Sequence, residues 1–234
     1  MTLKNKSVLI TGGTDGLGYQ LGKLLLKYGC VVHALGRDLD RMREARHGSH
    51  SLKFYTYQCD VSDSKQVEKT VEAIGKVDVV INTAGIWIEG LPQDNSVDEI
   101  SAAIDINLKG VVYVTRAVLP QMMKRDDGFV VNVISTSGLK GRLNESVYDA
   151  SKFGVAGFTK SLQEDLKSTN VKVVGVYPGG MKTKLFEKAG KPKTNEDWMD
   201  PKKVAEVIVF ILERDDTMYM DEVVINKRMT KTSN

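Results

Sequence analysis

Hydrophobic residues follow two alternating patterns along this chain. Short runs rich in Val and Ile are separated by longer stretches in which apolar residues recur every three or four positions. The first pattern predicts buried strands, and the second predicts amphipathic helices. We therefore expect strands at 8–10, 31–35, 52–58, 77–81, 130–134, 171–177 and 223–225, and helices at about 17–28, 38–46, 67–74, 98–124, 147–168 and 201–213.

Repeated strand–helix units predict an α/β fold with a parallel sheet covered by helices on both faces. We expect a Rossmann-type, doubly wound sheet of about seven strands. Pro120 falls inside the longest predicted helix, where we expect it to kink or end the helix. No linker or repeat interrupts the pattern, so we expect one nucleotide-binding domain over 1–234, with a substrate loop at 183–199 and a flexible tail at 226–234.

Composition narrows the function classes. The chain has 234 residues and a net charge of +3, which is too small to indicate nucleic-acid binding. No apolar run is long enough for a membrane helix, and we see no signal peptide. Two cysteines do not make a disulfide framework, so we expect a cytoplasmic protein. His47 and His50 lack further ligands nearby, and we expect no metal site.

A glycine-rich turn follows the first predicted strand. Residues 11–18 read TGGTDGLG, and a helix begins at once. Gly12 and Gly16 would let the backbone approach a pyrophosphate at the positive helix N-terminus, and Gly18 would let the helix pack closely on the strand. A plain tight turn is the alternative interpretation. The position between strand and helix favours nucleotide binding.

The spacing Thr-Gly-x-x-x-Gly-x-Gly resembles the short-chain dehydrogenase/reductase family. The segment Asn82–Gly85 reads NTAG where that family usually has Asn-Asn-Ala-Gly. The second asparagine stabilises the sheet in the family, and we expect Thr83 in its place to stabilise it less. Pro178, Gly179 and Thr183 resemble the family's Pro-Gly-x-x-x-Thr. The resemblance implies that the cofactor is bound by Gly12, Thr14, Asp15, Gly16, Leu17, Gly18, Arg37, Asp60, Val61, Asn82, Ala84, Gly85, Tyr148, Lys152, Pro178, Gly179 and Thr183.

Tyr148 and Lys152 lie four residues apart, so they share one face of a predicted helix. Reduction of a ketone needs a proton donor beside the carbonyl oxygen. A free tyrosine has a pKa of about 10, and a nearby ammonium lowers it. Ser135 could polarise the carbonyl oxygen, and Asn107 is unusual inside a helix. Taken alone, the pair reads as a packed tyrosine beside a solvated lysine.

The family resemblance implies a role for each of these residues. Ser135, Tyr148 and Lys152 match Ser…Tyr-x-x-x-Lys, and Ser135 is preferred to Ser137 because Gly138 then falls where the family has its glycine. Lys152 would also bind the nicotinamide ribose, and Asn107 would anchor a water relay. The implied function is interconversion of a carbonyl and a secondary alcohol by hydride transfer, with Tyr148 as general acid and base.

Two other functions are compatible with such a fold. One is a catalytically silent NAD(P)-binding redox sensor, which would not need Tyr148 or Lys152. The other is an isomerase or dehydratase that uses transient oxidation, for which the stretch after the sixth strand is short. The oxidoreductase interpretation accounts for more of the motifs.

The end of the second strand bears on the choice of cofactor. Gly36 stands where an acidic residue would bind both ribose hydroxyls and reject a 2′-phosphate, and Arg37 follows. A guanidinium suits a phosphate, so we expect NADP(H) to be preferred, with NAD(H) possible. Asp15 argues mildly against this choice, and Asp38 is placed to partner Arg37.

Loops at the carboxyl ends of the strands should shape the pocket for a small carbonyl or alcohol substrate. Four basic residues, Lys140, Arg142, Lys182 and Lys184, flank the predicted cleft. They could attract an acidic substrate, but a solvated rim is the favoured interpretation. The candidate wall residues are Ile86, Trp87, Ile88, Leu139, Leu143, Gly180, Met181, Leu185 and Phe186, with packing inside their own loops as the alternative for Trp87 and Phe186.

The resemblance also implies a homodimer or homotetramer. Family members associate through the two long helices, here at about 98–124 and 147–168. The second contact of the tetramer uses the C-terminal strand region. This chain lacks the glycine-rich ending common in the family, which puts the tetramer in doubt.

Overall fold

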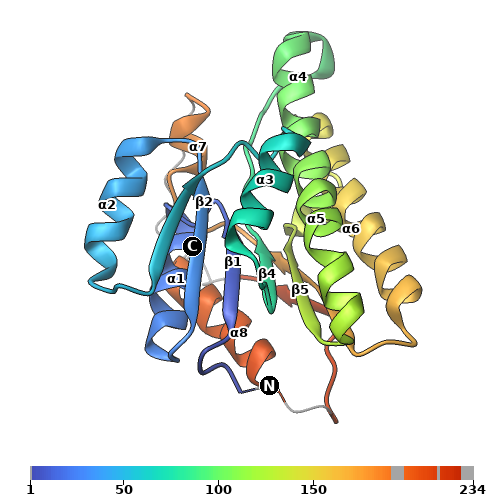
Figure 1. Ribbon diagram of the computed structural model, residues 1–234. Helices are drawn as coiled ribbons and strands as arrows, with labels where there is room; N and C mark the ends of the chain where they lie inside the picture. The colour runs from blue at the N-terminus through green and yellow to red at the C-terminus, as the bar shows by residue number, and fades with distance from the viewer. Residues whose placement is uncertain (1, 191–197, 215–216, 228–234) are drawn as a thin grey trace, which may run out of the picture.

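Seven parallel strands form one sheet in the order β3-β2-β1-β4-β5-β6-β7 (Figure 1). The computed structural model describes residues 2–190, 198–214 and 217–227. The expected doubly wound α/β fold is therefore confirmed. The strands are β1 (Ser7–Thr11), β2 (Val31–Gly36), β3 (Phe54–Gln58), β4 (Val79–Asn82), β5 (Gly128–Val133), β6 (Val171–Pro178) and β7 (Glu222–Ile225).

Helices cover both faces of the sheet (Figure 1). On one face, Leu21 of α1 and Ile208 of α8 belong to the same hydrophobic core as Ile10 of β1. On the other face, Val67 of α3 and Val114 of α5 belong to the same core as Leu9. Alternate residues of β1 therefore enter opposite cores, as the two-residue period of a strand requires. The helices are α1 (Gly16–Lys27), α2 (Leu39–Ser49), α3 (Ser64–Ile74), α4 (Val97–Ile104), α5 (Gly110–Arg125), α6 (Ser146–Leu166), α7 (Leu185–Lys188) and α8 (Pro201–Glu213).

The register of the central strands aligns their carboxyl ends. Thr11 of β1 pairs with Asn82 of β4, Asn82 pairs with Asn132 of β5, and Asn132 pairs with Gly175 of β6. The loops that follow β1, β4, β5 and β6 therefore emerge at the same edge of the sheet. That edge is where an open α/β sheet positions its ligand site.

The predicted helix at 98–124 is interrupted by a π-helical turn, Asp105–Lys109, between α4 and α5. The apolar pattern continues through the turn, so sequence periodicity could not reveal it. Such turns concentrate at functional sites. Pro120 does not end α5, which continues to Arg125, so of the two expected effects the end of the helix is wrong.

Two predicted segments lie only partly within the described residues. In the loop at 183–199, residues 191–197 lie outside them, and α7 is a helix that sequence periodicity did not indicate. Of the tail at 226–234, only Asn226 and Lys227 are described. None of the described helices is long and apolar enough to cross a membrane.

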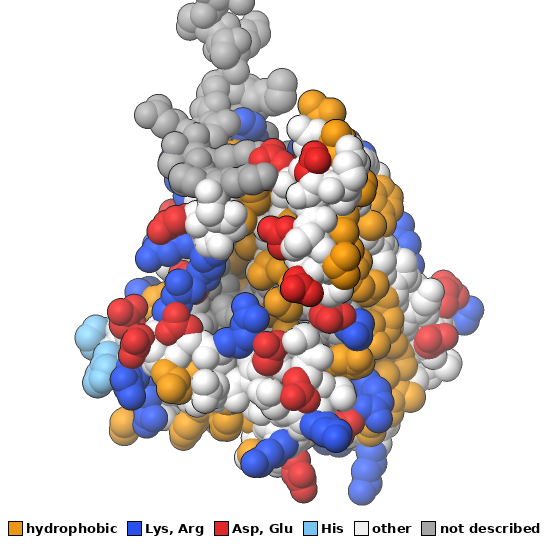
Figure 2. All heavy atoms as spheres, turned by 90° about the horizontal axis from the view of Figure 1, so that it is seen from above, with side chains coloured by type: hydrophobic (Ala, Val, Ile, Leu, Met, Phe, Trp, Pro, Cys, Tyr) orange, Lys and Arg blue, Asp and Glu red, His pale blue; other side chains and the backbone are white. Residues whose placement is uncertain are grey.

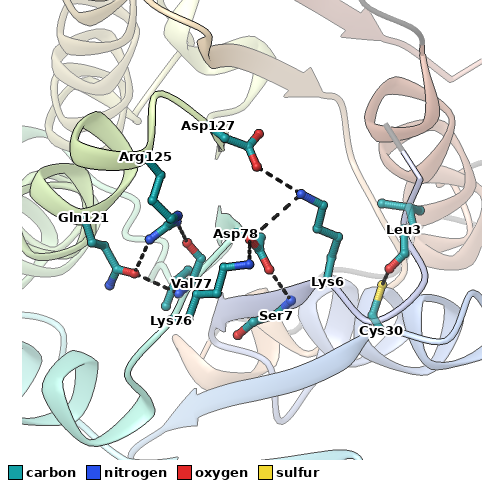
Figure 3. Close-up of polar contacts among 10 residues, drawn as sticks. All are labelled: Leu3, Lys6, Ser7, Cys30, Lys76, Val77, Asp78, Gln121, Arg125 and Asp127. Carbon is teal, nitrogen blue, oxygen red and sulfur yellow. Dashed lines mark hydrogen bonds and ion pairs between the residues drawn. The ribbon is translucent and has the colours of Figure 1, made fainter.

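A buried carboxylate joins three segments at the opposite edge of the sheet (Figure 3). The Asp78 side chain is 2% exposed and lies 2.8 Å from Lys76 Nζ and 3.9 Å from Lys6 Nζ. Its Oδ2 accepts a hydrogen bond from the Ser7 amide at 2.9 Å. Burial alone would raise the pKa of Asp78, but Lys76, the Ser7 amide and Lys6 hold it below the usual value.

Replacing this carboxylate should remove stability at neutral pH. Since the folded-state pKa lies below the unfolded value of about 3.9, the contribution is complete above about pH 5 and is lost as the pH falls through the folded pKa. Asp78→Asn should lower the free energy of unfolding by about 1–3 kcal/mol at pH 7, as measured by urea denaturation. The deficit should shrink toward pH 3.

Glu44→Gln is the matched control for that substitution, because it removes a carboxylate from the exposed surface of α2. We expect this control to leave the free energy of unfolding within about 0.5 kcal/mol of the wild type. A deficit for Asp78→Asn that is equal at both pH values would contradict the electrostatic account.

Candidate active site

One cleft of about 860 Å³ lies at the carboxyl-terminal edge of the sheet. Figure 2 looks onto this edge, with charged side chains spread over the α2 side and hydrophobic ones gathered toward α4, α5 and α6. Thirteen of the residues expected in the site line the cleft, namely Gly12, Asp15, Gly16, Leu17, Gly18, Ala84, Gly85, Ser135, Tyr148, Lys152, Pro178, Gly179 and Thr183. Six others do not line it: Thr14, Arg37, Asp60, Val61, Asn82 and Asn107.

The glycine-rich turn presents backbone to the cleft. Gly12 and Gly16 have φ of 64° and 52°, a region that favours glycine. A Cβ at Gly18 would lie 2.5 Å from the Gly12 carbonyl oxygen, so only glycine allows α1 to begin this close to β1. Asp15 caps α1 by accepting a hydrogen bond from the Gly16 amide at 2.7 Å. The N-terminus of α1 thus faces the cleft and favours an anion there.

Thr83 joins the ends of β4 and β1 rather than loosening them. Its hydroxyl donates a short hydrogen bond to the Thr11 carbonyl oxygen. The Thr11 hydroxyl in turn accepts from the amides of Thr83 and Ala84, both at 3.1 Å. The expected weakening at this position is therefore wrong, because a threonine hydroxyl reaches the neighbouring strand end.

Asn82 is buried within the sheet and begins a polar ladder. Its amide donates to Asn132 Oδ1 at 2.9 Å, and the Asn132 amide donates to the Thr159 hydroxyl at 2.9 Å. This ladder ties β4 and β5 to α6 in an otherwise apolar layer. The Asn82 side chain is only 1% exposed and does not reach the cleft. Asn82 therefore shapes the cleft indirectly, by holding the strand ends in position.

Ser135, Tyr148 and Lys152 meet at one end of the cleft. Ser135 begins the 3₁₀ turn after β5 with φ of 152° and ψ of 157°, a conformation that residues other than glycine rarely adopt. Its hydroxyl accepts a hydrogen bond from the Ser137 amide at 3.1 Å, and it lies close enough to Tyr148 to act on the pKa of the phenol. Lys152 Nζ lies 5.8 Å from the centroid of the Tyr148 ring, and both residues are buried. The structure thus brings a hydroxyl, a phenol and an amine together.

The charge balance at this end differs from the expectation. Burial raises the pKa of Tyr148, and the neighbouring Ser135 side chain offsets that rise only in part. Burial also lowers the pKa of Lys152 to about 8. The expected lowering of the Tyr148 pKa is thus wrong for the protein alone, because desolvation of the phenolate outweighs nearby positive charge. Tyr148 is a neutral phenol at neutral pH.

Asn107 lies in the π turn and is fully buried. Its amide donates to the Ile86 carbonyl oxygen at 2.9 Å and to the Ser151 hydroxyl at 3.0 Å, while its Oδ1 accepts from the Ile86 amide at 2.8 Å. Ser151 donates to the Tyr148 carbonyl oxygen at 2.6 Å. Asn107 therefore connects the loop after β4 to the first turns of α6, which carry Tyr148.

Charged residues cluster at the far end of the site, near the end of β2. Arg37 lies 3.5 Å from Asp60, with 58% of its side chain exposed. Asp38 caps α2 and pairs with Arg41 at 3.3 Å, so Asp38 does not partner Arg37. Burial alone would raise the pKa of Asp60, but Ser62 and Arg37 hold it below its usual value. Two guanidinium groups, each paired with a carboxylate, thus lie beside the end of β2.

Asp15 is paired from two directions. Lys188 of α7 lies 2.8 Å from its Oδ2, and Arg41 lies 3.7 Å from the same oxygen. Burial alone would raise the pKa of Asp15, but Lys188, the Gly16 amide and Arg41 keep it below its usual value. The acidic charge in the glycine-rich turn is therefore balanced within the protein.

Three aromatic rings in contact with one another also line the cleft. The centroids of Trp87 and Phe186 are 4.7 Å apart, as are those of Phe186 and Trp198. These contacts join loops after β4 and β6, so Trp87 and Phe186 do not pack within their own loops alone. Ile86, Gly180, Met181 and Leu185 also line the cleft, whereas Ile88, Leu139, Leu143 and Lys182 do not.

Sequence reasoning missed several residues that build the site. Asn132 and Thr159 were not singled out, although an asparagine inside the apolar run 130–134 was an available signal. Arg41 and Lys188 had no distinguishing pattern, because their partner Asp15 is distant in sequence. Trp198 reaches the cleft through a bridge between Met181 and Met199 that no periodicity reveals.

Comparison with known proteins agrees with this geometry. The family model described as short chain dehydrogenase matches residues 6–194. An uncharacterised oxidoreductase of Staphylococcus saprophyticus is 29% identical over 235 residues, which cover 95% of this chain and 97% of the relative. A second, from Staphylococcus aureus, is 28% identical over 227 residues, with the same coverage of both chains.

Solved structures show the same fold. A closed form of serine dehydrogenase complexed with NADP⁺ has a TM-score of 0.87 and 29% identity, over 94% of each chain. ElxO with NADP bound has a TM-score of 0.85 and 28% identity, covering 95% of this chain and 97% of that chain. Both similar structures were determined with an NADP cofactor in place.

Because Asn107 makes three buried hydrogen bonds, replacing it should lower the stability of the whole protein and loosen the loop that carries Ile86. Asn107→Leu should lower the free energy of unfolding by about 2–4 kcal/mol, because it leaves buried partners unsatisfied. Ser151→Ala, which removes one of the three bonds, should cost about 1 kcal/mol. Hydrogen exchange at the Ile86 amide should accelerate by more than the global change requires in Asn107→Leu. Exchange that follows global stability alone would contradict this account.

Proposed function

The chain belongs to the short-chain dehydrogenase family, and on that premise we propose that it is an NADP(H)-dependent oxidoreductase that interconverts a carbonyl group and a secondary alcohol. The observation that carries the proposal is the meeting of Ser135, Tyr148 and Lys152 at one end of a cleft whose other end is the glycine-rich turn. The carbonyl or alcohol carbon of a substrate held between these two ends would lie beside a proton donor.

The cleft suits a dinucleotide in shape and charge. Its volume of about 860 Å³ lies within the range of ligand pockets, and the glycine-rich turn leaves backbone open at the N-terminus of α1. Pro178, Gly179 and Thr183 border the nicotinamide end in this proposal, and Lys152 binds the adjacent ribose. When bound, the cofactor supplies a hydride to the carbonyl carbon or accepts one from the alcohol carbon.

Tyr148 is the proposed general acid and base. In the reductive direction its neutral phenol donates a proton to the carbonyl oxygen, which the Ser135 hydroxyl orients. In the oxidative direction its phenolate accepts the proton of the alcohol. Lys152 stabilises that phenolate by its charge, and Asn107 positions the turn that carries Tyr148 and anchors the proposed water relay. The raised pKa of Tyr148 keeps the phenol protonated at neutral pH, which is the form that donates the proton in reduction.

Arg37 is the proposed reader of the 2′-phosphate of NADP(H). No carboxylate stands at position 36, where a Cβ would lie 2.7 Å from the Thr14 hydroxyl. Asp60 and Val61 follow β3 and resemble the dipeptide that contacts the adenine in the family, and we propose the same role for them here. Two similar structures were determined with NADP, which supports the same preference here, with NAD(H) as the weaker cofactor. Serine, named in one of them, belongs in an alcohol panel.

A homodimer is part of the proposal. An apolar groove of about 400 Å³ runs between α5 and α6, and Met123 beside it is 42% exposed. A second copy of these helices would cover it. A tetramer would further require contacts at β7, the edge strand of the sheet. The groove is lined by Val112, Thr115, Arg116, Leu119, Pro120, Met123, Phe158 and Leu162.

The proposed compartment is the cytoplasm. Cys30 and Cys59 are both buried and unpaired. Burial raises the pKa of each thiol, which keeps them protonated and unreactive. Free thiols of this kind suit a reducing compartment.

Removal of the Tyr148 hydroxyl should separate catalysis from binding. Tyr148→Phe should lower kcat for NADPH-dependent carbonyl reduction by about 10²–10⁴-fold, because the proton donor is lost. NADPH affinity, followed by nicotinamide fluorescence, should change little. Tyr28→Phe, at an exposed tyrosine beyond the end of α1, is the matched control. NADPH binding without turnover by the wild type would instead favour the redox-sensor function.

Removal of the Arg37 charge should weaken NADPH binding selectively. A charge-assisted hydrogen bond to phosphate corresponds to about a ten- to hundredfold change in affinity. We expect Arg37→Gln to raise the Kd of NADPH by that factor and to leave the Kd of NADH unchanged. Arg43→Gln, at an exposed arginine of α2, serves as control. Equal weakening of both cofactors would refute the assignment of Arg37.

A further inference from the structure

The cleft carries an excess of positive charge. Its acidic residues are Asp15 and Glu145, and Asp15 is already paired with Lys188. Against these two acids stand six basic residues, namely Lys140, Arg142, Lys152, Lys184, Lys188 and Lys227. The glycine-rich turn and Arg37 account for phosphate binding at the cofactor end, so the remaining charge calls for another explanation.

Arg142 lies exposed at the rim of the cleft, but two hydroxyls hold its guanidinium in place. Its Nε donates to the Ser137 hydroxyl at 3.1 Å, and a terminal nitrogen donates to the Thr136 hydroxyl at 2.6 Å. Its backbone amide donates to the Asp149 carboxylate at 2.6 Å, which ties the loop to α6. Both partners of the guanidinium are uncharged hydroxyls, which orient the group. A held arginine loses less conformational entropy when it binds an anion.

The position of Arg142 places this charge at the substrate end. Thr136 and Ser137 directly follow Ser135, and Asp149 directly follows Tyr148. A group bound by Arg142 would therefore be a near neighbour of the carbonyl that Ser135 and Tyr148 hold.

Aromatic residues line another part of the cleft. The ring of Phe186 packs edge-on against Trp87 and tilted against Trp198. Such a surface suits an apolar or aromatic body. The site thus combines an oriented cation, a proton donor and an aromatic wall.

We propose that Arg142 binds an anionic group of the substrate, so that the substrates are oxo acids and the corresponding hydroxy acids with an apolar or aromatic body. The inference rests on the proposed function. It adds a specificity-determining residue to it and leaves the hydride and proton transfers as described. Lys140 and Lys184 at the rim attract the anion, and Arg142 binds it.

Matched acids and esters test this inference directly. We would measure NADPH oxidation with benzoylformate, benzoylacetate and 3-benzoylpropionate, each beside its methyl ester, which has the same carbonyl without the charge. At least one acid should exceed its ester in kcat/KM by about tenfold or more. The advantage should shrink as ionic strength rises, because salt screens the rim charges.

Arg142→Gln should lower kcat/KM for the preferred acid by about ten- to hundredfold, mainly through KM, and leave its ester within about threefold. Activity on the ester also shows that Ser135 and Tyr148 are still in place. Arg142→Lys keeps the positive charge but loses the planar, bidentate guanidinium, so its kcat/KM for the acid should lie between those of the wild type and Arg142→Gln. Arg43→Gln on α2 should leave both rates unchanged.

The outcomes separate the two proposals. Esters reduced as well as acids by the wild type, or equal losses on both in Arg142→Gln, would overturn the anionic subsite while the oxidoreductase function stands. The wild-type comparison alone decides this if a variant does not fold. No reduction of acid or ester despite NADPH binding would overturn the proposed function, and the inference with it.

Discussion

Parallel pairing of β1, β4, β5 and β6 aligns Thr11, Asn82, Asn132 and Gly175 in one row across the sheet. The chain positions that follow this row carry the glycine-rich turn, the loop around Gly85, the serine turn and the loop to α7. A slip of one residue in any strand would turn its side chains to the other face and displace the loop that follows. The cleft exists because four loops begin at the same level.

Buried polar bonds maintain that alignment. The ladder from Asn82 through Asn132 to Thr159 crosses an apolar layer, where a slipped register would leave amides unsatisfied. Asn107 adds a second set of buried hydrogen bonds, which join the loop after β4 to Ser151 of α6. The π turn gives Asn107 its inward position. These two sets of hydrogen bonds position the side chains of the cleft before any ligand binds, which reduces the entropic cost of ordering them on binding.

Periodicity and turn chemistry predicted the order of strands and helices, because each element has its own apolar pattern. The glycine-rich turn was also predictable from its local spacing, whereas Ser135, Tyr148 and Lys152 were assigned through the family resemblance. Other features depend on contacts between distant segments and leave no local pattern. These include the π turn, the pairing of Asp15 with Lys188 and the orientation of Arg142 by two hydroxyls. The pKa of Tyr148 depends on burial, which spacing does not report.

The central claim is that this cleft transfers a hydride between a nicotinamide and a carbonyl carbon. The most direct measurement uses NADPH with two deuterium atoms at C4 of the nicotinamide, a panel of carbonyl compounds and mass spectrometry of the alcohol products. The account predicts a product with one deuterium on the former carbonyl carbon, formed in equal amount with NADP⁺. NADPH consumed without deuterium in the product, or bound and never consumed, would contradict it.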